Sequence, residues 1–330
     1  MILQERIEVM ARLGEYLKEN TPNWQATKEK AFQHNAWFIT DFIDKAVENI
    51  VSNFLQIEKL QQWANHYHLD DTISQKNIGI VMAGNIPLVG FHDLLCVFVS
   101  GHRQTIKLSS KDNILIPFLL QILIDFDEKV AGYILIAEML KGCDAYIATG
   151  SNNSARYFEQ YFAKYPHIIR KNKTSLAVLS GEEREEQLAS LADDIHLYFG
   201  LGCRNVTKIY VPHNYDFVPL LQSFKKYLFF LDHHKYSNNY DYQLALMLMN
   251  KIYYMTNEAT LLIEAEAPFS AISVMHYEFY EPGTVHNLSL VNDDVQAVIG
   301  RGFIDFGQAQ QPLLEDYADS VDTMAFLLTL

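Results

Sequence analysis

The sequence predicts an α/β protein with two domains, and three observations lead to this fold class. The chain has 330 residues, which is long enough for two hydrophobic cores. Short β-branched segments alternate with helical stretches from residue 77 onward, a pattern typical of a parallel, doubly wound sheet. A second set of such segments follows residue 200. We therefore expect domains at 1–180 and 181–330, with a boundary near Ser180–Gly181.

The N-terminal half supports this fold class element by element. Residues 1–75 carry apolar side chains at helical spacing and no β-rich segment, so helices are expected there. After them, short β-branched runs end in polar or glycine-containing turns, and helical stretches separate the runs. The expected strands of this half are 77–82, 105–108, 145–148 and 175–179.

The C-terminal half shows the same alternation. A helical pattern covers residues 182–199, and the β-branched run 206–211 follows it as a strand. Further strands are expected at 260–264, 272–276 and 295–299, and further helices near 218–230 and 242–254. These elements predict a second α/β domain.

Composition and charge exclude several classes of protein. Apolar residues make up 49% of the chain and charged residues 20%, as in an ordinary globular protein. The formal net charge of −14 argues against a nucleic-acid partner, because such binding depends on neutralising phosphates. The apolar run 114–126 is interrupted by Pro117, Gln121 and Asp125, so no membrane span is expected. The three cysteines form no CxxC pair, which suits a reducing cytoplasm.

Polar turns follow the first three predicted strands. In a doubly wound sheet, ligands bind beyond the carboxyl ends of the strands. The turns 83–87, 109–112 and 149–154 all fall at that edge. No GxGxxG sequence follows the first strand, so the ordinary dinucleotide-binding signature is missing.

Cys203 lies in a tight connection between a predicted helix and a predicted strand, within the run FGLGCRN. The glycines before it allow strained turns and leave room for an approaching substrate. A thiol in such a place can act as a nucleophile. A small buried residue is the usual fate of a free cysteine, and the placement alone leaves both interpretations open.

The ordered set of turns resembles the aldehyde dehydrogenase superfamily. GNIPL at 84–88 is similar to that superfamily's turn with Asn and Pro, and IKLSS at 106–110 to its strand with a cofactor-binding lysine. ATGS at 148–151 resembles its turn over the cofactor. Cys203 falls where the nucleophile should, and FGQ at 306–308 resembles the C-terminal Phe-Gly motif. Each motif is weak alone, but their order is that of the superfamily.

Within the superfamily, the chain most resembles the fatty acyl-CoA reductases, the group that includes the reductase of bacterial luminescence systems. This resemblance is carried by VMAGNIPLVGFHD at 81–93, IATGSNNSARYF at 147–158, FGLGCRN at 199–205 and DHHKY at 232–236. It implies an aldehyde dehydrogenase-like fold, with a cofactor-binding sheet in the first domain and the nucleophile in the second. It also implies reduction of an acyl-CoA thioester to a fatty aldehyde through an acyl-cysteine.

The resemblance assigns roles to individual residues. Cys203 is expected to attack the acyl-CoA carbonyl, and the side-chain amide of Asn85 to help stabilise the oxyanion. No metal ion is implied. The residues expected to contact the cofactor are Pro87, Lys107, Ser110, Gly150, Ser151 and Glu266.

Two departures from the superfamily refine the expected reaction. Hydrolytic aldehyde dehydrogenases carry a general-base glutamate at the position of Ile169, and without that base the acyl-enzyme should resist water. This favours a reductase over a hydrolytic dehydrogenase. Members that prefer NAD often carry a glutamate at the position of Ser110, so its absence favours NADPH, with NADH as the alternative.

Other interpretations remain open. The chain could be a CoA-acylating aldehyde dehydrogenase of shorter aldehydes, or an inactive subunit that binds nucleotide or acyl chains in a larger complex. Asp232-His233-His234 also occurs in metal-dependent phosphoesterases, although a three-residue motif arises easily by chance. For the partners, the resemblance implies a homo-oligomer or a subunit that supplies acyl groups.

Overall fold

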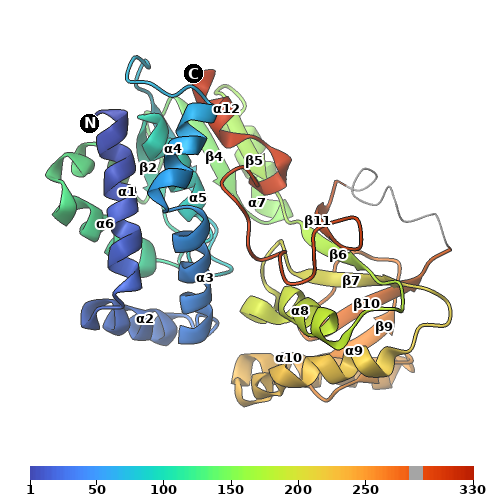
Figure 1. The fold of residues 1–330 in the computed structure, drawn as a ribbon. Helices are drawn as coiled ribbons and strands as arrows, with labels where there is room; N and C mark the ends of the chain where they lie inside the picture. Colours follow the sequence, from blue (N-terminus) through green and yellow to red (C-terminus); the bar gives the residue numbers. More distant parts are fainter. Residues whose placement is uncertain (282–292) are drawn as a thin grey trace. The chain divides into compact units, whose positions relative to one another are not determined.

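The computed structural model describes residues 1–281 and 293–330 and builds them around two β-sheets (Figure 1). The chain divides into two units, each with its own sheet. Unit 1 comprises Met1–Asn172 and Pro312–Leu330, and unit 2 comprises Lys173–Gln311. No helix among the described residues is both long enough and apolar enough to cross a bilayer.

The sheet of unit 1 has five parallel strands in the order β3-β2-β1-β4-β5. In its register, Val81 lies opposite Lys107 on one side and Ala148 on the other. The turns that follow these three strands therefore share the carboxyl edge of the sheet. The strands are β1 (Asn77–Val81), β2 (Arg103–Lys107), β3 (Ile134–Ile136), β4 (Ala145–Thr149) and β5 (His167–Arg170).

Helices enclose this sheet and share one hydrophobic core with it. Helix α5 is mostly apolar, and Leu95, Val97 and Phe98 are fully buried, as expected for a helix surrounded by protein. The helices of unit 1 are α1 (Leu3–Lys18), α2 (Pro22–His34), α3 (Thr40–Asn53), α4 (Ile57–His66), α5 (Phe91–Ser100), α6 (Leu115–Phe126), α7 (Asn152–Phe162) and α12 (Thr323–Leu328), with 3₁₀ turns at Glu128–Gly132 and Ala318–Ser320.

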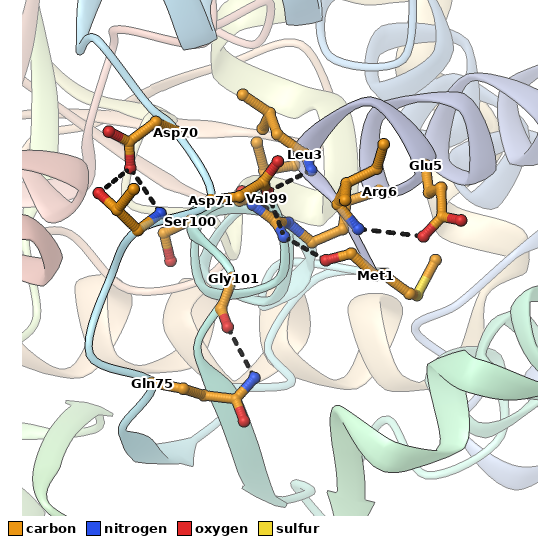
Figure 2. A network of polar contacts seen from close by, with 12 residues as sticks. Met1, Leu3, Glu5, Arg6, Asp70, Asp71, Gln75, Val99, Ser100 and Gly101 are labelled. Atoms are coloured by element: carbon orange, nitrogen blue, oxygen red, sulfur yellow. Dashed lines mark hydrogen bonds and ion pairs between the residues drawn. The ribbon is translucent and has the colours of Figure 1, made fainter.

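A buried arginine joins the first helix to the end of α5 (Figure 2). The side chain of Arg6 is 3% exposed, and its Nε donates to the Val99 carbonyl at 3.1 Å. Its Nη1 donates to the Met1 carbonyl at 2.7 Å and forms an ion pair with Asp71 at 3.4 Å. A buried guanidinium requires such acceptors, so these contacts fix the start of α1 against the end of α5.

The described part of unit 2 contains a six-stranded sheet in the order β11-β6-β7-β10-β9-β8, in which the β8–β9 pair is antiparallel and the other pairs are parallel. Its strands are β6 (Thr174–Val178), β7 (Val206–Val211), β8 (Met255–Thr256), β9 (Leu261–Glu264), β10 (Val274–Phe279) and β11 (Val295–Gly300). Its helices are α8 (Glu185–His196), α9 (Phe217–Ser223) and α10 (His234–Asn250), with 3₁₀ turns at Leu197–Gly200 and Phe224–Asp232.

One expected strand belongs to the other sheet. Residues 175–179 were expected as the fourth strand of the first sheet, but β6 pairs with β7 and β11 in unit 2. For that reason unit 2 begins at Lys173, before the boundary expected at Ser180–Gly181. The second departure is at the C-terminus, where residues 312–330 return to unit 1.

Candidate active site

The turn after β1 is packed tightly against the turn after β2. A side chain at Gly84 would place its Cβ 2.6 Å from the Ser109 hydroxyl oxygen, so only glycine fits there. Leu88, at the other end of the turn, has a positive φ of 58°. Its N–H donates to the buried carboxylate of Asp112 at 3.0 Å, and burial raises the pKa of Asp112 to about 6. These contacts hold the two turns together.

Four of the residues expected to function in unit 1 lie on or beside these two turns. Asn85 is half-buried and Pro87 is buried in the first turn. Lys107, the last residue of β2, and Ser110, in the second turn, are exposed. His34, at the end of α2, reaches Ser110: its Nε2 lies 2.8 Å from the Ser110 carbonyl oxygen. The structure thus brings an ammonium group and a hydroxyl to the same open edge of the sheet.

The turn after β4 begins a helix at the same edge. The Gly150 N–H donates to the Arg170 carbonyl at 3.2 Å, and Ser151 is the N-cap of α7. The Ser151 hydroxyl oxygen accepts a hydrogen bond from the Ser154 N–H at 3.2 Å. Ser151 therefore caps the helix that follows it. The N-terminus of α7 carries a partial positive charge, which favours a phosphate group.

In unit 2, Cys203 lies in the connection between α8 and β7. The helix ends at His196, earlier than the pattern predicted, because Tyr198, Phe199 and Gly200 all have positive φ angles between 56° and 73°. Two of these residues carry large side chains, for which such angles are strained. A strained backbone beside a thiol is a feature of functional sites.

Cys203 differs from the other two cysteines in its surroundings. Cys96 and Cys143 are buried, and burial raises the pKa of both thiols. Cys203 is half-buried, and its carbonyl oxygen accepts a hydrogen bond from the Ser175 hydroxyl at 3.1 Å. Of the chain's three thiols, Cys203 is therefore the least buried.

Glu266 lies on a loop whose main chain is fixed by three side chains. Lys208 is 1% exposed, and its Nζ donates to the Glu266 carbonyl at 2.6 Å. His276 Nδ1 donates to the Ala267 carbonyl at 2.8 Å. Thr207 donates to the Pro268 carbonyl at 2.6 Å. The Glu266 side chain itself is exposed.

The sequence did not predict these hydrogen bonds to the loop that carries Glu266, although the position of Lys208 could have indicated them. A lysine in the middle of an apolar strand is rarely buried unless it is paired. In the structure, its ammonium also forms an ion pair with Glu278 and lies over the Tyr210 ring.

The C-terminal Phe-Gly segment is tied to α8 by a buried carboxylate. Asp194 has no exposed surface, and it accepts hydrogen bonds from the Gly307 N–H at 2.6 Å and the Ala309 N–H at 3.0 Å. Burial raises the pKa of Asp194 to about 7, although the two backbone donors oppose this shift. The segment 306–309 thus depends on the helix that leads to Cys203.

His233 and His234 lie at the start of helix α10. His233 is the N-cap of α10, and its Nδ1 accepts a hydrogen bond from the Tyr236 N–H at 3.3 Å. Its ring lies 4.6 Å from the Phe199 ring. Across the described ranges 1–281 and 293–330, no group of three or more His, Cys, Asp or Glu side chains could hold a metal ion.

A pocket opens in unit 2 beside the connection that bears Cys203. It is small, with a volume of about 30 Å³. Phe199 and Gly200 form part of its wall, together with Phe230, Tyr236 and Ile272. His196 also lines it, and both ring nitrogens of this buried histidine have partners, the Ala192 carbonyl and the Thr260 hydroxyl. Burial lowers the pKa of His196 to about 4, so the imidazole is neutral at pH 7.

The two-sheet fold resembles that of solved aldehyde dehydrogenases. Aldehyde dehydrogenase 21 from Physcomitrella patens, in complex with succinate, has a TM-score of 0.68 at 12% identity, over 91% of this chain and 74% of that one. An indole-3-acetaldehyde dehydrogenase with NAD+ gives 0.63 at 11% identity, over 90% and 71%. A Mycobacterium tuberculosis aldehyde dehydrogenase with NAD+ gives 0.60 at 12%, over 91% and 73%. At such identities the likeness concerns the fold.

A narrower match gives the family. The family model for acyl-CoA reductase (LuxC) matches residues 15–219, which is more than half of the chain. The chain therefore belongs to the acyl-CoA reductase (LuxC) family and is an oxidoreductase. A search of curated protein sequences found no match. Both the fold class and the family expected from the sequence are confirmed.

Proposed function

We propose that this protein reduces an acyl-CoA thioester to a fatty aldehyde with NADPH, through an acyl-enzyme on Cys203. The observation that carries the proposal is the setting of Cys203, half-buried in a strained connection while the other two cysteines are buried. A reachable thiol on an ordered main chain is what nucleophilic catalysis requires.

The reaction divides into two steps at the Cys203 sulfur. In the first step, the Cys203 thiolate forms a bond to the acyl carbonyl carbon, and the coenzyme A thiolate leaves with its electron pair. In the second step, a hydride bonds to the acyl carbon, the bond between that carbon and the Cys203 sulfur breaks, the aldehyde departs, and the Cys203 thiolate is restored. When bound, the reduced nicotinamide cofactor supplies the hydride for this second step. The role of Asn85 as an oxyanion donor remains a prediction from the resemblance.

The residues of unit 1 fit a phosphorylated dinucleotide. The exposed Lys107 ammonium and Ser110 hydroxyl lie at the carboxyl edge of the sheet, and the N-terminus of α7 follows Gly150 and Ser151 at the same edge. A cation, a hydroxyl and a helix N-terminus are donors suited to phosphate and ribose groups. In unit 2, Glu266 is proposed to bind the nicotinamide ribose, with its main chain fixed by Lys208.

The absence of a general base supports reduction over hydrolysis. Ile169 occupies the position where hydrolytic aldehyde dehydrogenases carry a glutamate, and it lies in β5 between Ile168 and Arg170, both buried. Arg170 is held by Asp93 at 2.6 Å and by the Thr323 hydroxyl at 2.7 Å. None of these three β5 side chains can deprotonate a water molecule, so the acyl-enzyme should survive long enough to be reduced.

The chain length of the acyl group separates the proposed function from its alternative. The alternative, a CoA-acylating aldehyde dehydrogenase of shorter aldehydes, would use the same thiol. Comparison of turnover over acyl-CoAs of increasing chain length distinguishes the two functions.

Replacement of Cys203 tests the proposed nucleophile. Cys203→Ala should abolish acyl-CoA-dependent oxidation of NADPH, because no other group offers a thiol to the substrate. The residual rate should be at least about 10³-fold below that of the wild type. The measurement is the loss of NADPH absorbance, with mass spectrometry of the intact protein to detect the acyl adduct. Cys143→Ala is the matched control, and it should retain both the acyl-CoA-dependent oxidation of NADPH and the acyl adduct. Wild-type turnover by Cys203→Ala would overturn the proposal.

Replacement of Ser110 tests the preference for NADPH. Ser110→Glu places a carboxylate at the exposed position where NAD-preferring relatives carry one, so it should repel a 2′-phosphate. We expect the ratio of kcat/KM for NADPH to that for NADH to fall by about tenfold or more, which corresponds to about 1.4 kcal/mol. Ser52→Glu adds the same charge to an exposed site on α3 and should leave the ratio unchanged. An unchanged ratio in Ser110→Glu would place the 2′-phosphate elsewhere.

A further inference from the structure

A buried asparagine holds the connection that bears Cys203. Asn205 lies two residues after Cys203 and has no exposed surface. Its Oδ1 accepts a hydrogen bond from the Gly202 N–H at 2.8 Å. Its Nδ2 faces three carbonyl oxygens at the end of α8, those of Asp194 at 3.1 Å, Ile195 at 3.2 Å and Leu197 at 2.9 Å.

These contacts satisfy groups that a helix end leaves without partners. The last four carbonyls of an α-helix have no donor within the helix, and those of Asp194 and Ile195 belong to this set. An amide NH₂ group offers two donors, so one side chain can cover this helix end. The orientation of the amide follows from its partners, because the reverse orientation would turn Oδ1 toward three carbonyl oxygens.

The main chain of Asn205 ties the same connection to β6. Its N–H donates to the Gly202 carbonyl at 3.1 Å, and its carbonyl accepts from the Ser175 N–H at 3.0 Å. The Ser175 hydroxyl in turn donates to the Cys203 carbonyl. Residues 202–205 are therefore held from the helix on one side and from the sheet on the other.

The side chain of Asn205 also spans the strained stretch. Leu197 precedes the three residues with positive φ, and Gly202 follows them. Because Nδ2 binds the Leu197 carbonyl and Oδ1 binds the Gly202 N–H, one amide bridges both ends of that stretch. Strained backbone persists only where its surroundings determine it, and this bridge supplies the constraint.

We infer that Asn205 is a positioning residue for the nucleophile: it bridges Leu197 and Gly202 so that the strained stretch, and Cys203 after it, keep one conformation. This inference rests on the proposed function, in which Cys203 attacks the substrate. A role in folding alone would change stability without changing the chemistry of Cys203 in the folded protein. The two roles can therefore be separated.

The test compares two isosteric substitutions in the full chain. Asn205→Asp keeps the acceptor for Gly202 but replaces the NH₂ group by an oxygen that faces three carbonyls. Asn257→Asp is the matched control, because Asn257 is also buried in unit 2 but uses only its Oδ1, which accepts from the N–H groups of Ala259 and Thr260. For each folded variant, the rate constant for alkylation of Cys203 by iodoacetamide is measured against pH and located by peptide mass spectrometry. The values of kcat and KM are measured in parallel.

The inference predicts that the reactivity of Cys203 changes while the binding of the cofactor does not. In Asn205→Asp, the alkylation rate constant and kcat should change by about tenfold or more, since displacements near 1 Å have effects of this size or larger. The KM for NADPH should stay unchanged, and Asn257→Asp should match the wild type. Should Asn205→Asp fail to fold, Asn205→Ser, which is neutral and keeps one donor, decides the question.

Two outcomes separate this inference from the proposed function. Folded Asn205 variants with the wild-type alkylation profile and wild-type kcat would overturn the inference and leave the nucleophile assignment intact. Conversely, wild-type turnover by Cys203→Ala would refute the proposed function, and the altered alkylation profile of Asn205→Asp would then report only the conformation of the connection.

Discussion

At the scale of single residues, the sequence predicted the groups that face solvent better than the groups that hold them. Lys107 lies near the end of a predicted strand and Ser110 and Ser151 follow predicted strands, so their place at the sheet edge could be predicted from the pattern. The roles of Asn205 and Lys208 could not be predicted in this way. Their partners lie up to 11 and 70 residues away in sequence, and a polar residue shows no sign of its partner before the chain is folded.

The pH dependence of stability should depend on Asp194. Its pKa is about 7 in the folded protein, against an ordinary value of 3.8. The folded state therefore binds this proton more tightly than the unfolded state, and the free energy of unfolding should fall as pH rises from about 4 to about 7. The contribution of this one group is at most about 4 kcal/mol. Urea unfolding across this pH range measures it.

A variant without a titrating group isolates this contribution. The free energy of unfolding of Asp194→Asn should depend less steeply on pH than that of the wild type between pH 4 and pH 7. Asp241→Asn removes an exposed carboxylate from α10 and should follow the wild-type curve. Parallel curves for the wild type and Asp194→Asn would show that the Asp194 proton is not linked to folding.

At the scale of elements, the predictable strands are those with β-branched runs bounded by turns. β1, β2, β4 and β7 lie within about two residues of their predicted bounds. β3, β5 and β8 were not predicted, and they have only three, four and two residues. β6 was predicted as a strand but was assigned to the wrong sheet. A local sequence pattern predicts that a segment is a strand, but it does not predict which strands pair with it.

The end of α8 shows a second limit of local prediction. The pattern predicted a helix to Phe199, and neither Tyr198 nor Phe199 favours the left-handed conformation that they adopt. Their conformation is determined by contacts that follow later in the chain, including the Asn205 amide. A local pattern cannot show where a helix ends when the cause lies beyond it.

At the scale of the whole molecule, the C-terminal segment belongs to the unit that contains the N-terminus. Trp63 donates through its ring nitrogen to the Tyr317 hydroxyl at 3.0 Å, and Tyr67 donates to Asp322 at 2.7 Å. Helix α12 packs on α5 (Figure 1). The sequence analysis assigned this segment to the second domain, because an apolar pattern does not reveal which of two cores it joins.

Deletion of residues 312–330 should destabilise unit 1 selectively. The segment buries Leu314, Tyr317, Met324 and Leu327, each 6% exposed or less. At about 1.5–3 kcal/mol for each side chain, their loss amounts to roughly 6–12 kcal/mol, comparable to the stability of a whole domain. In hydrogen exchange followed by mass spectrometry, β1 and β4 should lose protection while β6 and β7 keep it.

The control for this deletion keeps the segment but alters its exposed surface. Val321→Ser with Leu328→Ser changes two side chains that are each 40% exposed, and protection of β1 should be retained. Unchanged protection of β1 and β4 after the deletion would mean that unit 1 is stable without its C-terminal part.

The return of the chain to unit 1 also sets an order during synthesis. Residues 1–172 leave the ribosome first, but Trp63 and its neighbours lack their packing partners until residues 312–330 are synthesised. Unit 2 is one continuous stretch of about 140 residues, which takes roughly 7–28 s to translate. Throughout that interval the apolar side chains that residues 312–330 later bury remain exposed.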